Sequence, residues 1–284
     1  MRDVVPTPPL PPPLARTVAC ELERFSGSVA LWVNDLRRRE MYGFRADEPF
    51  DPASTAKVFV LLELFRQAEV GAVTLDEEIE LRERDMVDGS GVLKDLTPGL
   101  RLSLRDAAIL MITVSDNVAA NMLTGRLGLG AINRGARAAG ARCTHLTNPG
   151  MRRRQGQSFT TARDLGCVVA RMARRTAVSP TASREMVDIL ARERTDNIVG
   201  RLLPDAGSDG RPLRRAWRIA SKNGSVRGVR NDVALVRGNG LAYVIALLSQ
   251  GCQDLRYSPD NEATLCLARI ARAVHDHVAE VNGA

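Results

Sequence analysis

Lysine is scarce in this sequence. Of its 40 lysine and arginine residues only three are lysine, at positions 57, 94 and 222, and the other 37 are arginine. The chain therefore uses arginine almost wherever a positive charge is sufficient. Arginine keeps its proton in proteins, whereas a lysine that is desolvated or placed beside another cation can lose it. Lys57, Lys94 and Lys222 are thus the residues to examine for a role that arginine cannot fill.

Aromatic residues are also few, at 4% of the chain. The formal net charge of +7 would suit a nucleic-acid partner, but the arginines are scattered along the sequence and few rings are present on which bases could stack. The tightest basic run, residues 152–154, is expected to be a solvated loop. We therefore expect no nucleic-acid partner.

Cysteines are too dispersed for a metal site or a disulfide framework. Their number is odd and no two are close, at Cys20, Cys143, Cys167, Cys252 and Cys266. No glycine-rich dinucleotide-binding motif follows a predicted strand. The sequence therefore predicts reduced, mostly buried thiols, and neither a metal nor an organic cofactor.

Two kinds of apolar segment are missing. No stretch approaches the ~18 consecutive apolar residues of a membrane span, so no membrane partner is expected. The first 14 residues contain six prolines and do not show a basic region followed by an apolar one, which is the pattern of a secretory leader. We expect residues 1–13 to form a proline-rich disordered arm and the protein to be cytoplasmic.

The stretch 51–57 carries the first candidate chemistry. Ser54 and Lys57 are three residues apart, which on a helix puts both side chains on one face and within reach of each other. The apolar run 58–62 predicts a buried helix over 54–69. A serine at the start of that helix lies among unpaired backbone N–H groups, which favour negative charge on an oxygen. A neutral lysine beside it could take the serine proton, so Ser54 is the candidate nucleophile and Lys57 the candidate base.

Two further short motifs follow in order. The triplet Ser-Asp-Asn at 115–117 lies between two helical patterns, and the triplet Lys-Asn-Gly at 222–224 lies on a predicted strand. An S-x-x-K, an S-D-N and a K-x-G triplet in this order resemble the motifs of the penicillin-recognising serine enzymes, most closely the class A β-lactamase-like group. The resemblance covers residues 25–280, nearly all of the chain.

The resemblance implies a role for each motif residue. Ser115 would relay a proton toward the leaving group, and Asn117 would orient the substrate amide and Lys57. Lys222 would tune the charge of Lys57 together with burial. Asp116, between the first two, is expected to point inward and hold its loop.

The predicted strand that carries Lys222 would also contribute its backbone. The resemblance implies that the N–H groups of Ser54 and Ser225 form an oxyanion hole. Gly224, which lies beside Ser225, permits close approach of a substrate backbone.

One position on this strand departs from the family. Most members have Thr or Ser where this chain has Asn223, and that hydroxyl normally helps to bind a substrate carboxylate. Arg227 or Arg230, just beyond the strand, could replace it through bidentate pairing. A surface charge is the plain alternative for each arginine.

The largest departure lies in the middle of the chain. Class A β-lactamases place a glutamate in an Ω-shaped loop, where it activates the water that hydrolyses the acyl-enzyme. The corresponding segment here, residues 144–161, holds neither Glu nor Asp. The parts for acylation are present and the usual part for deacylation is missing. Lys57 acting twice, or His145, could replace it, although a loop-anchoring hydrogen bond is the plainer expectation for His145.

The order of the predicted elements indicates the fold class. Predicted strands occupy 28–33, 39–44, 217–223, 232–237 and 241–248, and predicted helices occupy 14–26, 54–69, 103–114, 117–127, 161–173, 181–193, 195–203 and 261–281. We expect one α/β (α+β) domain over residues 14–284 with the β-lactamase/transpeptidase-like fold. Its sheet part, 14–50 and 206–284, would be an antiparallel sheet flanked by terminal helices, and 54–205 a large all-helical insertion.

These observations predict a serine hydrolase that forms an acyl-enzyme on Ser54 with an amide, ester or β-lactam carbonyl, with weak or no ordinary β-lactamase turnover. Three alternatives stay open. They are a true β-lactamase with a substitute deacylation base, which would serve antibiotic resistance, a carboxypeptidase or acyltransferase of the D-Ala-D-Ala type, and a non-catalytic β-lactam-binding protein. Turnover separates the enzymes from the binding protein, which would keep a stable adduct. The expected partner is a small molecule, and the sequence leaves the oligomeric state open.

Overall fold

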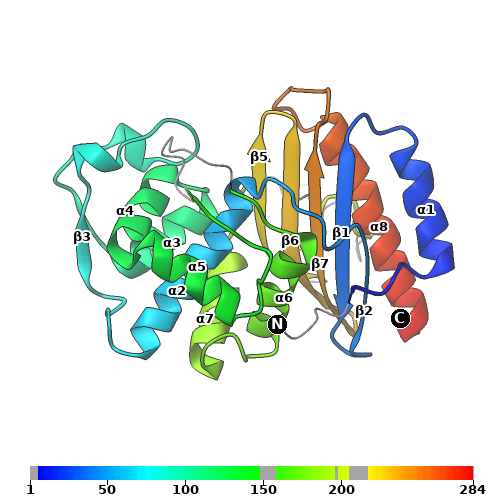
Figure 1. Cartoon of the computed structure of the whole chain (residues 1–284), viewed down its shortest axis with the longest axis horizontal. Helices are drawn as coiled ribbons and strands as arrows, with labels where there is room; N and C mark the ends of the chain where they lie inside the picture. Colours follow the sequence, from blue (N-terminus) through cyan, green and yellow to red (C-terminus); the bar gives the residue numbers. More distant parts are fainter. Residues whose placement is uncertain (1–5, 148–157, 196–197, 205–216, 284) are drawn as a thin grey trace.

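A five-stranded antiparallel sheet forms the centre of the molecule (Figure 1). The computed structural model describes residues 6–147, 158–195, 198–204 and 217–283. The strands follow the order β2-β1-β7-β6-β5 and comprise β1 (Ser28–Asp35), β2 (Glu40–Phe44), β5 (Arg218–Val226), β6 (Val229–Gly238) and β7 (Leu241–Gln250). The two ends of the chain meet where β1 pairs with β7, from Ser28 opposite Gln250 to Asp35 opposite Tyr243.

Helices cover both faces of this sheet. α1 (Pro12–Leu22) and α8 (Glu262–Asn282) pack together on one face, and α6 (Ala162–Ala173) lies on the other (Figure 1). The second part of the molecule contains α2 (Lys57–Glu69), α3 (Leu104–Thr113), α4 (Asn117–Leu127), α5 (Leu129–Ala138) and α7 (Pro180–Leu190). It also holds the short strands β3 (Glu78–Glu80) and β4 (Arg101–Ser103) and the 3₁₀ turns η1 (Ala53–Ala56), η2 (Glu83–Asp85) and η3 (Leu93–Asp95).

β1 is buried on both of its faces. Val29, Leu31 and Val33 pack into the core shared with α1 and α8, whereas Ala30 and Trp32 pack into the core shared with α2 and α6. Side chains alternate between the two faces of a strand, so a strand covered on both sides is apolar throughout. This explains why the segment shows no alternation of polar and apolar residues.

α2 runs through the middle of the helical part. Its first nine residues, 57–65, are all buried, and it contacts α3, α4, α5 and α7. A helix that is buried on every side is enclosed by protein and is held by packing. Two of the nine residues have ionisable side chains. Glu63 pairs with Arg66 one turn later, at 2.6 Å, while Lys57 faces the motif residues described below.

The structure confirms the predicted fold and corrects parts of the helical insertion. That part is not all-helical, because β3 pairs with β4, and α5 was not predicted. β3 and β4 have three residues each, too few for a periodic signal, and α5 contains glycines, which weaken a helical pattern. The helix predicted at 195–203 is wrong over 198–203, which form turns, and 196–197 lie outside the described residues.

Residues 6–11 differ from the disordered arm expected for 1–13. Pro8 accepts a hydrogen bond on its carbonyl oxygen from the N–H of Gly43, at 2.8 Å, and Leu10 is buried. α1 begins at Pro12, where proline lacks only an N–H that the first helical turn does not use. The prolines therefore shape an extended segment along β2, and residues 1–5 lie outside the described part of the chain.

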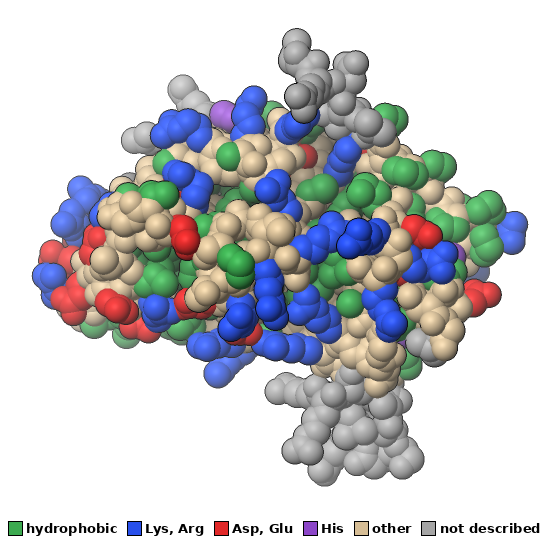
Figure 2. All heavy atoms as spheres, turned by 90° about the horizontal axis from the view of Figure 1, so that it is seen from below, with side chains coloured by type: hydrophobic (Ala, Val, Ile, Leu, Met, Phe, Trp, Pro, Cys, Tyr) green, Lys and Arg blue, Asp and Glu red, His purple; other side chains and the backbone are tan. Residues whose placement is uncertain are grey.

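Charged side chains are unevenly distributed over the surface. On the face shown in Figure 2, lysine and arginine side chains spread over several regions, and acidic side chains gather at the end that carries β3. Within the described ranges, none of the helices combines the length and the apolar character that crossing a membrane requires.

Candidate active site

Ser54 lies in the 3₁₀ turn η1, which runs directly into α2. Ala53 has a positive φ of 44°, and its N–H donates to Asp51 Oδ1 at 2.8 Å. Asn231 of β6 donates through Nδ2 to the Asp51 carbonyl oxygen, also at 2.8 Å. These contacts fix the turn against the sheet and leave the Ser54 side chain partly exposed. The helix predicted from Ser54 thus starts as a tighter turn.

The amine of Lys57 is surrounded by oxygens. Its Nζ lies 3.2 Å from Ser54 Oγ, 3.0 Å from Ser115 Oγ, 2.6 Å from the Ser115 carbonyl oxygen and 2.8 Å from Asn117 Oδ1. The Lys57 side chain has no exposed surface. The structure therefore brings Ser54, Ser115 and Asn117 together around this single nitrogen.

The setting of Lys57 favours the neutral form of its amine. Burial holds the pKa of Lys57 well below its ordinary value, and the positive charge of Lys222 lowers it further. The carboxylates of Asp116 and Glu193 oppose the shift. A lysine whose pKa is lowered in this way carries a lone pair that can remove a proton from a hydroxyl.

The loop that carries Ser115 is held in a rare conformation. Ser115 has φ 54°, in the left-handed region that few residues other than glycine adopt. Asp116 fixes it: Oδ1 accepts from the N–H of Ala119 at 2.9 Å and caps α4, and Oδ2 accepts from Val92 and Leu93 at 2.7 and 2.9 Å. The Asp116 carboxylate thus points inward and ties two loops together.

Asn117 is oriented by the loop of residues 88–95. Its N–H donates to the carbonyl oxygen of Ser90 at 3.0 Å and its Nδ2 to that of Asp88 at 3.2 Å, which leaves Oδ1 for Lys57. Lys94, in the same loop, is partly exposed and pairs with the adjacent aspartate at 2.8 Å. The third lysine of the chain therefore has a surface role.

β5 touches the turn that carries Ser54. A Cβ added to Gly224 would lie 2.8 Å from the Ser54 backbone nitrogen and 2.9 Å from that of Thr55. Only a glycine permits this approach of two backbones. Ser225, the next residue, is exposed. The two N–H groups expected to form an oxyanion hole thus belong to segments that are in contact.

Sequence reasoning missed Glu193, the partner of Lys222. Both side chains are buried, and Lys222 Nζ lies 2.6 Å from Glu193 Oε1. The carboxylate also accepts from the N–H of Asn223 at 3.0 Å and from the Ser221 hydroxyl at 2.7 Å. A buried lysine implies a counter-charge. Nothing in the local sequence marks this glutamate, which ends the predicted helix 181–193 and lies 29 positions from Lys222.

The side chain of Asn223 lies in the same cluster. Its Oδ1 is 3.2 Å from Lys222 Nζ and 2.9 Å from the hydroxyl of Thr195. The hydroxyl that the family places at position 223 is thus absent, and a threonine from another segment lies next to the asparagine.

The two candidate arginines have different surroundings. Arg227 is exposed in the turn between β5 and β6. Arg230 is buried, and its guanidinium donates to the carbonyl oxygens of Val226 at 2.9 Å, Val229 at 2.8 Å and Arg256 at 2.5 Å. The donors of Arg230 are used by backbone carbonyl oxygens of its own strand turn and of Arg256, whereas Arg227 faces solvent.

The segment expected to carry deacylation chemistry is described at 144–147 and 158–161. His145 is exposed, and its N–H and carbonyl oxygen both pair with the backbone of Phe159 at 2.9 Å. The two rings are 5.8 Å apart between centroids. His145 thus anchors one end of the segment through its backbone.

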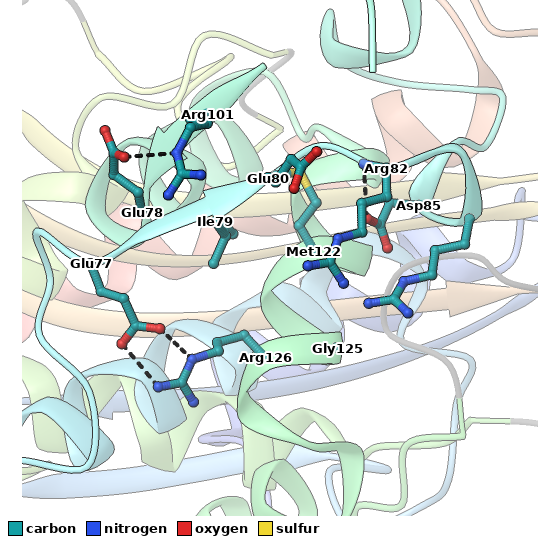
Figure 3. Close-up of a pocket in the computed structure, with 11 residues that line it drawn as sticks. Glu77, Glu78, Ile79, Glu80, Arg82, Asp85, Arg101, Met122, Gly125 and Arg126 are labelled. Atoms are coloured by element: carbon teal, nitrogen blue, oxygen red, sulfur yellow. Dashed lines mark hydrogen bonds and ion pairs between the residues drawn. The ribbon is translucent and has the colours of Figure 1, made fainter. Parts of the chain in front are cut away.

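A groove of about 560 Å³ lies elsewhere, at the outer end of the helical part (Figure 3). Two ion pairs border it: Arg126 with Glu77 and Arg101 with Glu78, each with an N–O distance of 2.9 Å (Figure 3). The groove is lined by none of the candidate site residues. Within the described ranges, no group of three or more His, Cys, Asp and Glu side chains is placed to hold a metal ion.

Comparison with known proteins agrees with this geometry. The sequence profile of the Beta-lactamase enzyme family matches residues 13–278. The chain belongs to this family. As a family member it is a β-lactamase-like serine hydrolase, which confirms the resemblance drawn from the three motifs.

Individual members of the family are distant relatives in sequence. A Beta-lactamase of Rhodobacter capsulatus is 27% identical over 267 residues, which cover 92% of this chain and 88% of that protein. The crystal structure of a beta-lactamase from Sphaerobacter thermophilus DSM 20745 superposes with a TM-score of 0.82 at 28% identity, covering 95% of this chain and 97% of the other. The structure of PBP-A gives the same TM-score at 25% identity and covers 98% and 100%. The β-lactamase/transpeptidase-like fold is thereby confirmed.

Proposed function

We propose that Ser54 attacks the carbonyl carbon of a β-lactam and becomes acylated, with Lys57 as the base. The observation that carries this proposal is the distance of 3.2 Å between Lys57 Nζ and Ser54 Oγ, at a fully buried lysine whose pKa is lowered. The chain supplies arginine for nearly every other cation, and a guanidinium could not accept this proton.

The acylation step uses the oxygens around Lys57. The bond between Ser54 Oγ and the lactam carbon forms, and the lactam C–N bond breaks. The Oγ proton passes to Lys57 Nζ. Ser115 Oγ, 3.0 Å from the same nitrogen, passes its proton to the departing lactam nitrogen and takes one from the Lys57 ammonium, which becomes neutral again. No atom leaves, so the adduct carries the whole mass of the lactam.

Residues on β5 and on the segments beside it bind the charged groups of the substrate and orient it. The backbone N–H groups of Ser54 and Ser225 stabilise the oxyanion, an interaction for which loss of one donor typically costs ~10²–10³ in rate. Asn117 orients the substrate amide. Lys222 and Arg227 face the carboxylate of the lactam, and Arg227 supplies the contact for which Asn223 has no hydroxyl.

A related structure supports a lactam as the acylating group. A mutant form of PBP-A, which superposes on 98% of this chain with a TM-score of 0.82 at 25% identity, was solved as an acyl-enzyme complex with penicillin G. A protein with the same fold therefore forms an acyl-enzyme with penicillin G.

We further propose that the acyl-enzyme is hydrolysed slowly. The segment 144–161 contains no Glu or Asp to activate water. A positioned general base usually contributes ~10²–10⁴-fold, so deacylation is expected to be slower by about that factor than in an enzyme that has one. Acylation is then faster than hydrolysis of the acyl-enzyme, and the adduct accumulates.

Intact-protein mass spectrometry tests the acylation. The protein is mixed with penicillin G, a cephalosporin or an activated ester and sampled over time. The expected result is one adduct per chain, on Ser54 by peptide mapping, and none on Ser54→Ala. A Ser54→Ala protein that still acquired the label at a site serine would overturn the assignment.

Rapid mixing with a chromogenic cephalosporin tests the slow release. The expected trace is a burst equal to the enzyme concentration, followed by slow turnover. Fast multiple turnover without a burst would support the alternative of a true β-lactamase with a substitute base. His145→Ala then decides between bases: retained fast turnover would assign the water activation to Lys57 or another group.

A further inference from the structure

We infer that Glu193 is a positioning residue that holds the Lys222 ammonium in place and charged, and thereby fixes the positive charge that faces Lys57. The kinetic part of this inference rests on the proposed function. The charge pairing itself is testable without any substrate.

Three successive residues of β5 converge on the Glu193 carboxylate. Oε1 accepts from Lys222 Nζ at 2.6 Å and from the N–H of Asn223 at 3.0 Å, and Oε2 accepts from the Ser221 hydroxyl at 2.7 Å. The Glu193 side chain is 2% exposed and that of Lys222 is 0% exposed. Charge-assisted hydrogen bonds of this number and length favour the ionised carboxylate.

The segment that carries this carboxylate connects both halves of the site. The N–H of Arg194 donates at 2.9 Å to the carbonyl oxygen of Thr113, two residues before Ser115. The hydroxyl of Thr195 lies 2.9 Å from Asn223 Oδ1. The end of α3 and strand β5 are therefore joined through residues 193–195. A change at Glu193 is thus expected to affect both Lys222 and, through it, Lys57.

A second acid lies behind the first. Asp232 of β6 is opposite Asn223 in the strand register, has no exposed surface, and accepts from the N–H of Val199 at 3.0 Å. Burial and then the charge of Glu193 raise the pKa of Asp232 to about 7. Asp232 thus holds a proton below about pH 7, and Glu193 is there the acid that compensates Lys222.

The consequence for Lys222 follows from its burial. The titratable groups that interact with both members of the pair are Asp232 from β6 and Lys57 from α2, and Asp116 acts on Lys57. Removing one partner of a buried pair leaves the other charge uncompensated. Without the Glu193 charge, the Lys222 ammonium gives up its proton at a lower pH.

The small number of lysines makes a direct experiment possible. The protein is prepared with ¹³C-labelled lysine, and the three Cε signals are followed by NMR over a pH series, with Lys94→Arg to assign the surface residue. In Glu193→Gln, the Lys222 signal is expected to move to the neutral-amine position at a pH lower by at least about one unit than in the wild type. Glu193→Asp keeps the carboxylate on a shorter side chain, and its Lys222 transition is expected at a pH between those of the other two proteins.

Glu63→Gln is the matched control. Glu63 is also a fully buried glutamate in an ion pair, but it lies in α2 and its partner is Arg66. Its replacement is expected to leave the Lys222 transition in place. An equal shift in Glu63→Gln and Glu193→Gln would overturn the inference, because the effect would then be unspecific.

Acylation kinetics provide the second readout. In Glu193→Gln the alkaline limb of the acylation rate is expected to move to lower pH by the same amount as the NMR transition, with a larger loss for an anionic lactam than for an uncharged ester. If lactams still acylate Glu193→Gln and its Lys222 titration is unchanged, the inference is overturned and the proposed function is left intact. If the Lys222 titration shifts in Glu193→Gln but no lactam acylates even the wild type, the charge pairing is supported and the proposed function is overturned instead.

Discussion

Gly224 of β5 lies directly against the backbone of Ser54, so close that a Cβ at position 224 would be 2.8 Å from the Ser54 nitrogen. The strand that carries Lys222 and the turn that carries Ser54 are thus in contact through backbone atoms. A clash at this contact could not be relieved by rotating a side chain of either segment. This contact helps to set the distance between the two proposed oxyanion donors, Ser54 and Ser225.

Gly224→Ala is therefore expected to lower the acylation rate by about 10²-fold or more, because the added methyl pushes the turn away from β5 and separates the donors. The measurement is the rate of adduct formation by mass spectrometry, taken below the unfolding temperature. Gly125→Ala, in α4, is the control, since a Cβ there meets nothing within 4 Å. An acylation rate in Gly224→Ala equal to that of the wild type would contradict this assignment.

Lys57→Arg is expected to be nearly as damaging as Lys57→Ala. Arginine keeps a positive charge but cannot accept the Ser54 proton, so acylation should slow by about 10²–10⁴-fold. Lys94→Arg is the control, because the partly exposed Lys94 pairs with an adjacent aspartate that arginine can also serve. Near-normal acylation in Lys57→Arg would make Lys57 a structural cation.

The acylation rate of the wild type is expected to fall at low pH because Lys57 becomes protonated. Its pKa is lowered well below the ordinary 10.5 by burial and by Lys222, so the neutral amine is present at far lower pH than for a free lysine. Below this pKa the rate should drop about tenfold for each pH unit. Adduct formation measured across pH checks this. An acidic limb near pH 10.5 would show that Lys57 is not perturbed.

The sequence predicted the sheet and the motif residues because both leave local signals. The strands of the sheet read as apolar runs bounded by turns, and S-x-x-K places Ser54 and Lys57 on one face of a turn. The rarity of lysine added a signal of its own. Ser115 and Asn117 do contact Lys57 in space, as the order of motifs implied.

The features missed are those that only tertiary packing creates. Glu193 reaches Lys222 through the fold from 29 residues away, and its neighbours in sequence are ordinary polar residues. Arg230 could not be separated from Arg227 by sequence, because only the fold brings the carbonyl oxygen of Arg256, 26 positions away, to the Arg230 guanidinium. β3 and β4 are held by three residue pairs and lack a periodic pattern.

Gly166→Ala is expected to destabilise the protein although alanine is the better helix former. Gly166 of α6 packs on the ring of Trp32 in β1, and a Cβ would lie 2.2 Å from that ring. The ring is fully buried, so overpacking should cost about 1–3 kcal/mol, more than the gain in helix propensity. Chemical unfolding measures this. Gly125→Ala, on an exposed part of α4, should instead gain up to about 1 kcal/mol. Equal stability changes in both variants would contradict the packing argument.

Asp232→Asn is expected to remove a pH dependence of stability. The folded-state pKa of Asp232 is about 7, whereas an unfolded aspartate has a pKa of ~3.9. Because the folded state binds this proton more tightly, the stabilising contribution is complete below ~3.9 and is lost as the pH rises to about 7. Asparagine does not titrate and retains an oxygen for the Val199 N–H. The free energy of unfolding of Asp232→Asn, compared with that of the wild type, should therefore increase as the pH rises from ~3.9 to about 7.

Urea unfolding of both proteins at several pH values measures that difference. Asp254→Asn serves as the control, because the pKa of Asp254 is lowered, chiefly by its hydrogen bond with Arg256. The carboxylate of Asp254 is thus ionised in the folded and in the unfolded state over most of the window, and its replacement should change stability by a nearly constant amount from about pH 5 to about pH 7. If Asp232→Asn also showed a constant difference there, Asp232 would carry its charge throughout. Glu193 and Asp232 would then both be ionised beside Lys222, and the division of roles between the two acids would be wrong.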